Sequence, residues 1–139
     1  MKENTAIRRF STKLRVRYSE TDKMGFCYYG NYAQYFEVAR VEALRELGIV
    51  YKNLEENGIL LPVTDFKISY KQAAKYDDVL EIRTVISKLE GTRITFQYEV
   101  YNEAEVKLNE AETTLVFVDA TSMKPMAVPK FISNLVNHG

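Results

Sequence analysis

The longest regular spacing of apolar residues lies within residues 31–47 and predicts a helix. Apolar residues there fall at offsets 0, 3, 4, 7, 11, 12 and 15 from the first of them, which places them on one helix face. They are Tyr32, Tyr35, Phe36, Ala39, Ala43, Leu44 and Leu47. Val38 and Val41 are also apolar but lie off that face. The apolar surface is therefore wider than that of a typical surface helix, as if a sheet curls around it.

The residues that flank this helix indicate where it begins and ends. Asn31 is a suitable N-cap, because its short side chain can accept a hydrogen bond from a backbone N–H of the first turn. Gly48 is a suitable C-terminal stop. Residues 50–57 predict a short second helix that Gly58 closes, and the segment after Pro129 predicts a short terminal helix.

Elsewhere, apolar and polar residues alternate, which predicts strands. The segments with this pattern are residues 12–19, 60–73, 79–88, 92–102 and 106–119. In the first of them, Leu14, Val16 and Tyr18 share one face, and in the last the apolar run 115–118 predicts a central strand. Short turns separate the later strands, so we expect an antiparallel meander. A strand, a long helix and a run of strands together indicate the α+β class.

The composition is that of an ordinary soluble globular protein. The 139 residues predict a single domain, 1–139. Hydrophobic residues make up 46% of the chain, and 19 basic residues balance 19 acidic ones. A net charge of zero gives no general attraction to nucleic acid or to an anionic membrane. No run approaches the ~18 to 20 apolar residues of a membrane span. The beginning of the chain lacks the apolar segment of a signal peptide, so we expect a cytoplasmic protein.

The rarity of two residue types argues against several kinds of active site. Cys27 is the only cysteine, and His138, next to the last residue, is the only histidine. A disulfide within the chain, a Ser-His-Asp or Cys-His arrangement and a His-rich or Cys-rich zinc site are therefore not expected. Neither a GxGxxG nor a P-loop motif occurs. We expect no metal and no cofactor.

One carboxylate in a short loop before the long helix is the sharpest candidate for chemistry. Asp22 precedes Gly25, which allows a sharp turn, and the helix begins a few residues later. A helix start offers unpaired backbone N–H groups and a partial positive charge. The N–H groups of Tyr29 and Gly30 could hold an oxyanion while Asp22 acts as a nucleophile or general base on an activated acyl bond. The alternative is that Asp22 only caps its own turn.

Other residues near this segment have two interpretations each. Glu20 could share the role of Asp22, but an exposed charge at the end of a strand is the simpler expectation. Glu37 and Arg40 are spaced for an ion pair on the helix surface. A cluster of tyrosines could line an acyl pocket or pack in the core, and it comprises Tyr28, Tyr29, Tyr32 and Tyr35.

Taken together, these segments resemble the hot-dog-fold acyl-CoA thioesterases of the 4-hydroxybenzoyl-CoA thioesterase family. The resemblance spans roughly residues 12–135 and is most specific in the first segment. It rests on residues 16–25 (VRYSETDKMG), 29–32 (YGNY) and 37–40 (EVAR), and continues through Val63, 68–70, 77–78, 91–94, 124–126 and Pro129.

The resemblance implies a long helix wrapped by a strongly bent antiparallel sheet of about five strands. It implies hydrolysis of an acyl-CoA to a free acid and coenzyme A, in a homodimer or homotetramer with its sites at the dimer interface. The family's catalytic aspartate falls on Asp22, and the backbone N–H that polarises the carbonyl falls on Tyr29, where some relatives carry a histidine. Residues expected to contact the substrate are Gly25, Gly30, Asn31, Tyr32, Val63, Lys88 and Arg93.

The two basic residues of that set, with Lys124, could meet the phosphates of coenzyme A, or they could simply be solvated. Three other functions stay open. The chain could hydrolyse acyl groups carried by acyl carrier protein, or bind acyl thioesters without catalysis. A hydratase or dehydratase on the same fold relies on a histidine, for which His138 is badly placed.

Overall fold

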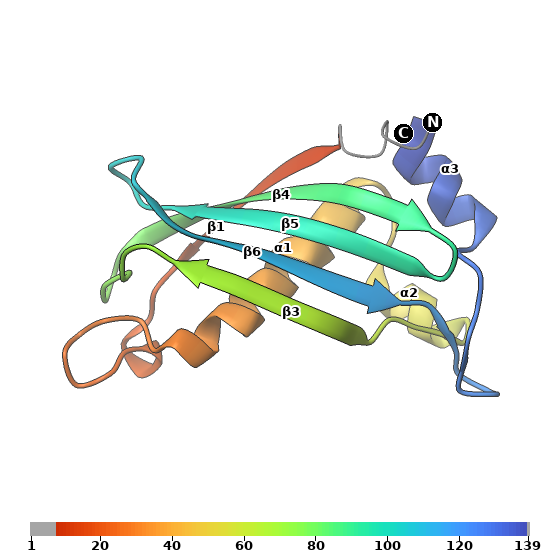
Figure 1. The fold of residues 1–139 in the computed structure, drawn as a ribbon, viewed down its shortest axis with the longest axis horizontal. Coiled ribbons are helices and arrows are strands. Elements are labelled where there is room, and N and C mark those ends of the chain that lie inside the picture. Colours follow the sequence, from red (N-terminus) through yellow and green to blue (C-terminus); the bar gives the residue numbers. More distant parts are fainter. Residues whose placement is uncertain (1–7, 139) are drawn as a thin grey trace.

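A curved five-stranded antiparallel sheet with one long helix across its inner face forms the body of the molecule (Figure 1). The computed structural model describes residues 8–138, so residues 1–7 and 139 of the expected domain lie outside the described residues. The helix is α1 (Tyr32–Glu46). In spatial order the strands are β1 (Arg9–Arg15), β4 (Val79–Glu90), β5 (Arg93–Tyr101), β6 (Lys107–Val116) and β3 (Val63–Tyr70). The expected α+β class is confirmed.

Shorter elements surround this body. A second small sheet is made of β2 (Ile59–Leu60), β7 (Val118–Asp119) and β8 (Lys124–Pro125). Two further helices are α2 (Tyr51–Glu56) and α3 (Lys130–His138), close to the predicted segments. Single 3-10 turns occur at Tyr18–Glu20 and Tyr29–Asn31.

The core lies between α1 and the inner face of the sheet. The ring of Phe36 stacks on that of Tyr98 of β5, with centroids 4.5 Å apart. The Tyr98 hydroxyl pairs with the Thr113 hydroxyl of β6 at 2.6 Å, so this buried polar group is satisfied. The predicted apolar stripe of α1 is buried along its whole length. Stacked aromatic rings therefore fix the helix on the sheet.

The two ends of α1 differ from each other. At the C-terminal end the N–H groups of Gly48 and Ile49 donate to the carbonyls of Arg45 and Leu44 at 2.9 and 2.8 Å. This is a Schellman arrangement, as the predicted glycine stop requires. At the N-terminal end Asn31 holds the cap position, but its side chain does not cap the helix. The preceding 3-10 turn instead runs directly into α1.

The prediction for the first strand was wrong at its end. The strand stops at Arg15, and Tyr18, expected on the buried face, is 78% exposed within a 3-10 turn. Pairing with the segment before β4 ends at Val16, whose N–H donates to the carbonyl of Asp78 and whose carbonyl accepts from the N–H of Asp77, both at 2.9 Å, and the 3-10 turn follows. Two other predicted strands each divide in two, since 60–73 covers the end of β2 and all of β3, and 106–119 contains β6 and β7. The strand β6 is interior, but β5 is the central one.

The expected ion pair on the surface of α1 does not form. Glu37 is exposed, whereas Arg40 is buried and lies near the hydroxyl groups of Tyr98 and Tyr51. Burial by itself would lower the pKa of Arg40, but these neighbouring hydroxyls raise it. Arg40 therefore belongs to the interior of the fold.

One edge of the sheet is open along β3. This strand pairs with β6 on one side only, and its other side faces solvent. The inward-facing side chains extend past α1, so that Val63, Phe66 and Tyr70 remain 44%, 42% and 48% exposed. An exposed edge with apolar side chains is a template for pairing with another strand.

Candidate active site

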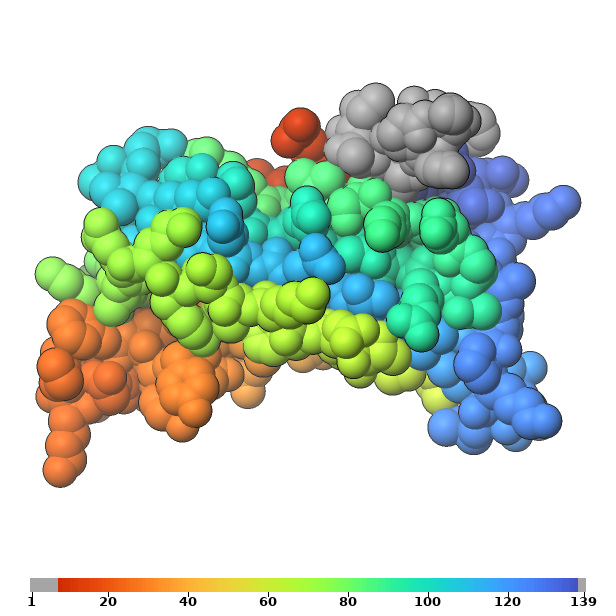
Figure 2. Space-filling model, in the orientation of Figure 1, coloured from red at the N-terminus to blue at the C-terminus, as the bar shows by residue number. Residues whose placement is uncertain are grey.

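The loop that carries Asp22 is closed by main-chain hydrogen bonds. The N–H of Asp22 donates to the carbonyl of Phe26 at 2.8 Å, and the N–H of Gly25 donates to the carbonyl of Asp22 at 3.0 Å. Gly25 has a φ of +82°, a left-handed conformation that glycine adopts without strain. The loop therefore holds Asp22 in one place at the end of the molecule, where this segment projects beyond the sheet (Figure 2).

The two carboxylate oxygens of Asp22 have different surroundings. Oδ1 accepts from the N–H groups of Met24 and Phe26 at 2.9 and 3.2 Å. Within residues 8–138, Oδ2 makes no hydrogen bond and no ion pair. The turn-capping interpretation is thus correct for one oxygen, and the other oxygen is available to a ligand.

The helix start offers donors beside this carboxylate. Tyr28 is extended, and the 3-10 turn Tyr29–Asn31 follows it. The N–H of Asn31 donates to the carbonyl of Tyr28 at 3.0 Å. Across the part of the chain that the structure describes, the N–H groups of Tyr29 and Gly30 have no acceptor. These are the orphan donors that a helix start leaves.

A cavity of about 530 Å³ brings the predicted carboxylate and the helix start together. Asp22, Tyr29 and Tyr32 all line it. Tyr70 of β3 also lines it, with its ring centroid 5.8 Å from that of Tyr32. The further lining residues are Phe26, Cys27, Tyr28, Lys71, Gln72 and Ala73. The walls are mainly aromatic, which suits the burial of an apolar acyl group.

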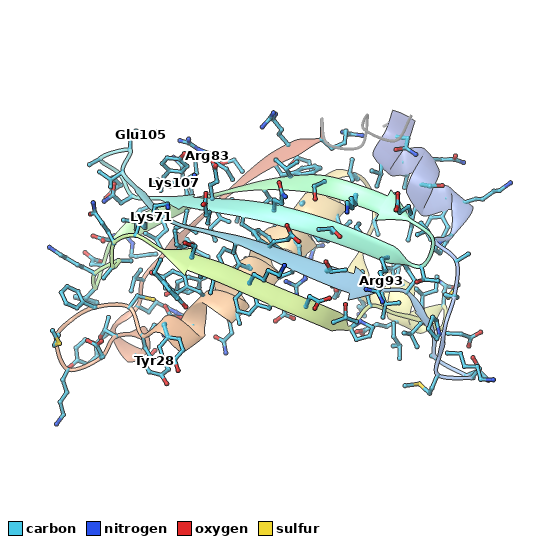
Figure 3. All side chains as sticks on the ribbon, viewed as in Figure 1. Tyr28, Lys71, Arg83, Arg93, Glu105 and Lys107 are labelled. Carbon is cyan, nitrogen blue, oxygen red and sulfur yellow. The ribbon has the colours of Figure 1, made fainter. Side chains whose placement is uncertain are left out.

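Of the seven residues expected to contact the substrate, Tyr32 lines this cavity, whereas Gly25, Gly30 and Asn31 are sequence neighbours of lining residues and are not part of the lining. The other three lie elsewhere within one chain. Val63 begins β3, whereas the cavity borders Tyr70 at the end of that strand, about 23 Å away at 3.3 Å per residue. Lys88 and Arg93 line a separate hollow of about 830 Å³ on the outer face of the sheet. Figure 3 shows Arg93 and Tyr28 at opposite ends of the sheet. A single chain therefore does not bring these three residues to Asp22.

Sequence reasoning missed a buried polar cluster beneath the loop. Glu20, expected to be exposed, is only 6% exposed. Its Oε1 accepts from the backbone N–H of Arg17 at 2.9 Å and from the hydroxyl of Tyr35 at 2.8 Å. Its Oε2 accepts from Nε and Nη2 of Arg17 at 3.0 and 2.6 Å. The only available signal was the inward position of Tyr35 on the helical stripe, which does not reveal its partner.

The electrostatics of this cluster keep each group in a defined protonation state. Burial alone would raise the pKa of Glu20, but the hydrogen bonds and charge of Arg17, with the Tyr35 hydroxyl, lower it. Burial and the neighbouring Cys27 and Glu20 raise the pKa of Tyr35 well above its ordinary value. Burial likewise raises the pKa of the Cys27 thiol. At neutral pH Glu20 is therefore an anion that Tyr35 contacts as a donor, and Cys27 is a neutral thiol.

Within residues 8–138, no group of three or more acidic, histidine or cysteine side chains is arranged to hold a metal ion. No helix in this part of the chain is long and apolar enough to cross a lipid bilayer.

Comparison with known proteins finds similarity along nearly the whole chain. The model of the thioesterase-like superfamily matches residues 16–136. The acyl-CoA thioester hydrolase YbgC of Escherichia coli is 36% identical over 129 residues, covering 93% of this chain and 95% of that protein. The putative acyl-CoA thioesterase YneP of Bacillus subtilis is 36% identical over 118 residues, covering 85% of this chain and 86% of that protein.

A solved structure agrees with these sequence matches. The crystal structure of a DHNA-CoA thioesterase from Staphylococcus aureus superposes with a TM-score of 0.86 and is 34% identical. The superposition covers 91% of this chain and 85% of that one. The resemblance to the hot-dog-fold thioesterases, which was inferred mainly from the segments around Asp22, is confirmed.

Proposed function

We propose a site chemistry for this chain, which belongs to the thioesterase-like superfamily, has the hot-dog fold and is a thioester hydrolase. Its substrate is an acyl-CoA, and the products are the free acid and coenzyme A. The observation that carries the proposal is one cavity lined by Asp22, whose Oδ2 is unpaired, and by Tyr29 at the helix start, where the N–H groups of Tyr29 and Gly30 are unpaired. That pairing supplies both an attacking group and an oxyanion site.

The acyl transfer runs between these two parts of the site. The thioester carbonyl accepts hydrogen bonds from the N–H groups of Tyr29 and Gly30, which stabilise the negative charge that develops on its oxygen. Oδ2 of Asp22 either attacks the carbonyl carbon, giving an anhydride that water then hydrolyses, or takes a proton from the water that attacks. In both routes the C–S bond breaks, the thiolate leaves and is protonated, and one water is consumed.

The aromatic walls place the acyl group. The rings of Tyr32 and Tyr70 contact each other at an interplanar angle of 59°, and those of Tyr28 and Tyr29 are tilted at 44° with centroids 5.0 Å apart; all four residues line the cavity. Rings in this arrangement can hold an apolar or planar acyl group by contact area, while their hydroxyls keep a polar edge.

The complete site is a property of a homodimer. If two β3 strands pair antiparallel about their midpoint, the partner's Val63 comes to lie opposite Tyr70 beside the cavity. The end of the partner's sheet that bears Lys88 and Arg93 would then lie next to the cavity. This arrangement would bring together the predicted residues that a single chain keeps apart, and the basic pair would meet the phosphates of coenzyme A.

A thiol-release assay over a panel of acyl-CoAs tests this chemistry with Asp22→Asn. The amide retains an Oδ1 acceptor for the loop N–H groups but cannot attack or act as a base at neutral pH. We expect kcat/KM to fall by at least about a hundredfold, the lower end of an acid–base contribution. Unchanged turnover would remove Asp22 from the mechanism, and acyl-CoA binding without thiol release by the wild type would favour a non-catalytic binder.

Asp119→Asn is the matched control for that substitution. Oδ1 of Asp119 caps its own turn by accepting from the N–H groups of Thr121 and Ser122 at 2.8 and 3.3 Å, much as Oδ1 of Asp22 does. It does not line the cavity. We expect this variant to retain the wild-type rate, which separates loss of a turn cap from loss of the reacting group.

A further inference from the structure

The carboxylate of Glu20 joins two segments around the site. Its two oxygens accept hydrogen bonds from Arg17, which lies before the Asp22 loop, and from Tyr35, which lies in the first turn of α1. Four donors surround its two oxygens, so this charge is buried and fully hydrogen-bonded. A buried carboxylate with this many partners holds them in one geometry, because removing any one leaves a desolvated group unpaired.

The backbone carbonyl of the same residue holds the helix start. It accepts from the N–H of Tyr28 at 2.8 Å and from Nδ2 of Asn31 at 2.7 Å. These two residues bracket Tyr29 and Gly30, whose N–H groups are unpaired. The Asn31 side chain is therefore engaged by the Glu20 carbonyl and does not cap the helix.

We propose that Glu20 is a positioning residue that sets the separation between the Asp22 carboxylate and the N–H groups of Tyr29 and Gly30. The inference rests on the proposed function of that site. Asp22 follows Glu20 by two residues, and the segment 28–31 is hydrogen-bonded to the Glu20 carbonyl. The positions of both parts of the site therefore depend on one anchored residue. A reacting group displaced by about 1 Å can cost a hundredfold in rate.

Glu20→Gln tests the anchor, because the amide turns one acceptor oxygen into a donor that opposes the donors of Arg17 or Tyr35. At a temperature where the variant is fully folded, we expect kcat for thiol release to fall about tenfold or more, with KM within about twofold. Tyr35→Phe removes one of the four donors and is expected to give a smaller fall. The fold-decrease in kcat of the double variant is expected to be smaller than the product of the two single fold-decreases, since both substitutions act through one contact.

Glu81→Gln is the matched control. Glu81 also accepts hydrogen bonds from an arginine and a hydroxyl, namely Arg83 at 2.9 Å and Ser11 at 2.6 Å. It lies on the outer face of the sheet, away from the cavity. We expect this variant to keep the wild-type kcat.

Amide hydrogen exchange supplies a readout that does not depend on activity. In Glu20→Gln we expect the amide of Tyr28 to exchange at least about tenfold faster, while amides of β5 keep their rates. A lower unfolding temperature with unchanged kcat and exchange would mean a structural role only and overturns the proposal.

Failure of the proposed function gives a different result. An inactive Asp22→Asn beside a fully active Glu20→Gln overturns the positioning role and leaves the thioesterase mechanism intact. If the wild type releases no thiol from any acyl-CoA, the mechanism fails, and unchanged exchange at Tyr28 would then overturn the anchoring role as well.

Discussion

Glu20 and Asp22 are two carboxylates separated by one residue, yet they meet opposite surroundings. The 3-10 turn Tyr18–Glu20 points the first inward, where Arg17 and Tyr35 supply donors. The loop closed by Phe26 leaves the second at the surface, with one oxygen committed to the turn and one free. The backbone path therefore decides which carboxylate supports structure and which is available for chemistry.

The buried carboxylate predicts a pH dependence of stability. The pKa of Glu20 in the folded protein lies below its ordinary value, because the bonds from Arg17 and Tyr35 outweigh the opposing effect of burial. Its contribution to stability is therefore complete above the unfolded pKa of about 4.3 and is lost as the pH falls through the folded pKa. We expect the difference in free energy of unfolding between wild type and Glu20→Gln to stay constant near neutral pH and to shrink below about pH 4.3.

Urea unfolding curves at a series of pH values measure this difference. Glu103→Gln serves as the control, since Glu103 is exposed on the turn between β5 and β6. Its variant is expected to match the wild type at every pH. A difference for Glu20→Gln that persists unchanged into acid would contradict the role of the ionised carboxylate.

At the scale of elements, the spacing of apolar residues predicted the regular helices and strands and failed where a strand ends. The stripe of α1 places every third or fourth side chain in the core, and the alternation of β4 and β5 places every second one there, so their spacing alone located them. The end of the first strand was misplaced because Tyr18 continues the alternation, whereas pairing ends at the bonds between Val16 and the segment 77–78 and a 3-10 turn follows. Contacts between segments distant in sequence, such as Glu20 with Tyr35, leave no local pattern.

The start of α1 gives a prediction about two glycines. A Cβ on Gly30 would lie 2.7 Å from Cε2 of Tyr28, an exposed ring that can swing away into solvent. A Cβ on Gly25 would meet nothing within 4 Å, but φ there is +82°. We expect Gly30→Ala to keep the free energy of unfolding within about 1 kcal/mol of wild type, while KM rises because Tyr28 lines the cavity. We expect Gly25→Ala to lose about 1 to 2 kcal/mol through backbone strain.

Chemical denaturation and steady-state kinetics on the two variants separate these effects. The steric change at Gly30 acts on a ring of the cavity wall, and the change at Gly25 acts on the backbone of the loop. A large loss of stability in Gly30→Ala would show that the Tyr28 ring cannot move and that the helix start is more rigid than its exposure suggests.

At the scale of the whole molecule, the outer face of the sheet and its free edge differ in chemistry. The outer face carries a network of ion pairs in which Lys107 contacts Glu99 and Glu110, and Arg83 contacts Glu81 and Glu105 (Figure 3). Exposed pairs of this kind add little stability each but keep a surface hydrated. The exposed apolar side chains of β3 lie instead along the free edge, and Tyr70 among them borders the cavity.

The free edge predicts that activity requires a second copy of the chain. The ring of Phe66, near the midpoint of β3, is 42% exposed, and a second copy paired along this edge would cover it. Phe66→Lys replaces it with a positive charge, so that two paired copies would bring like charges together. We expect wild type to elute with a mass above that of one chain in gel filtration with light scattering, and the variant to shift to monomer and lose most thiol release.

Phe131→Lys on α3, where the ring is 51% exposed and far from β3, is the matched control and should change neither. Because Phe66 also touches Phe36, circular dichroism must show a folded variant. A folded monomer that keeps its full rate would mean that one chain holds the whole site and that the edge has another purpose.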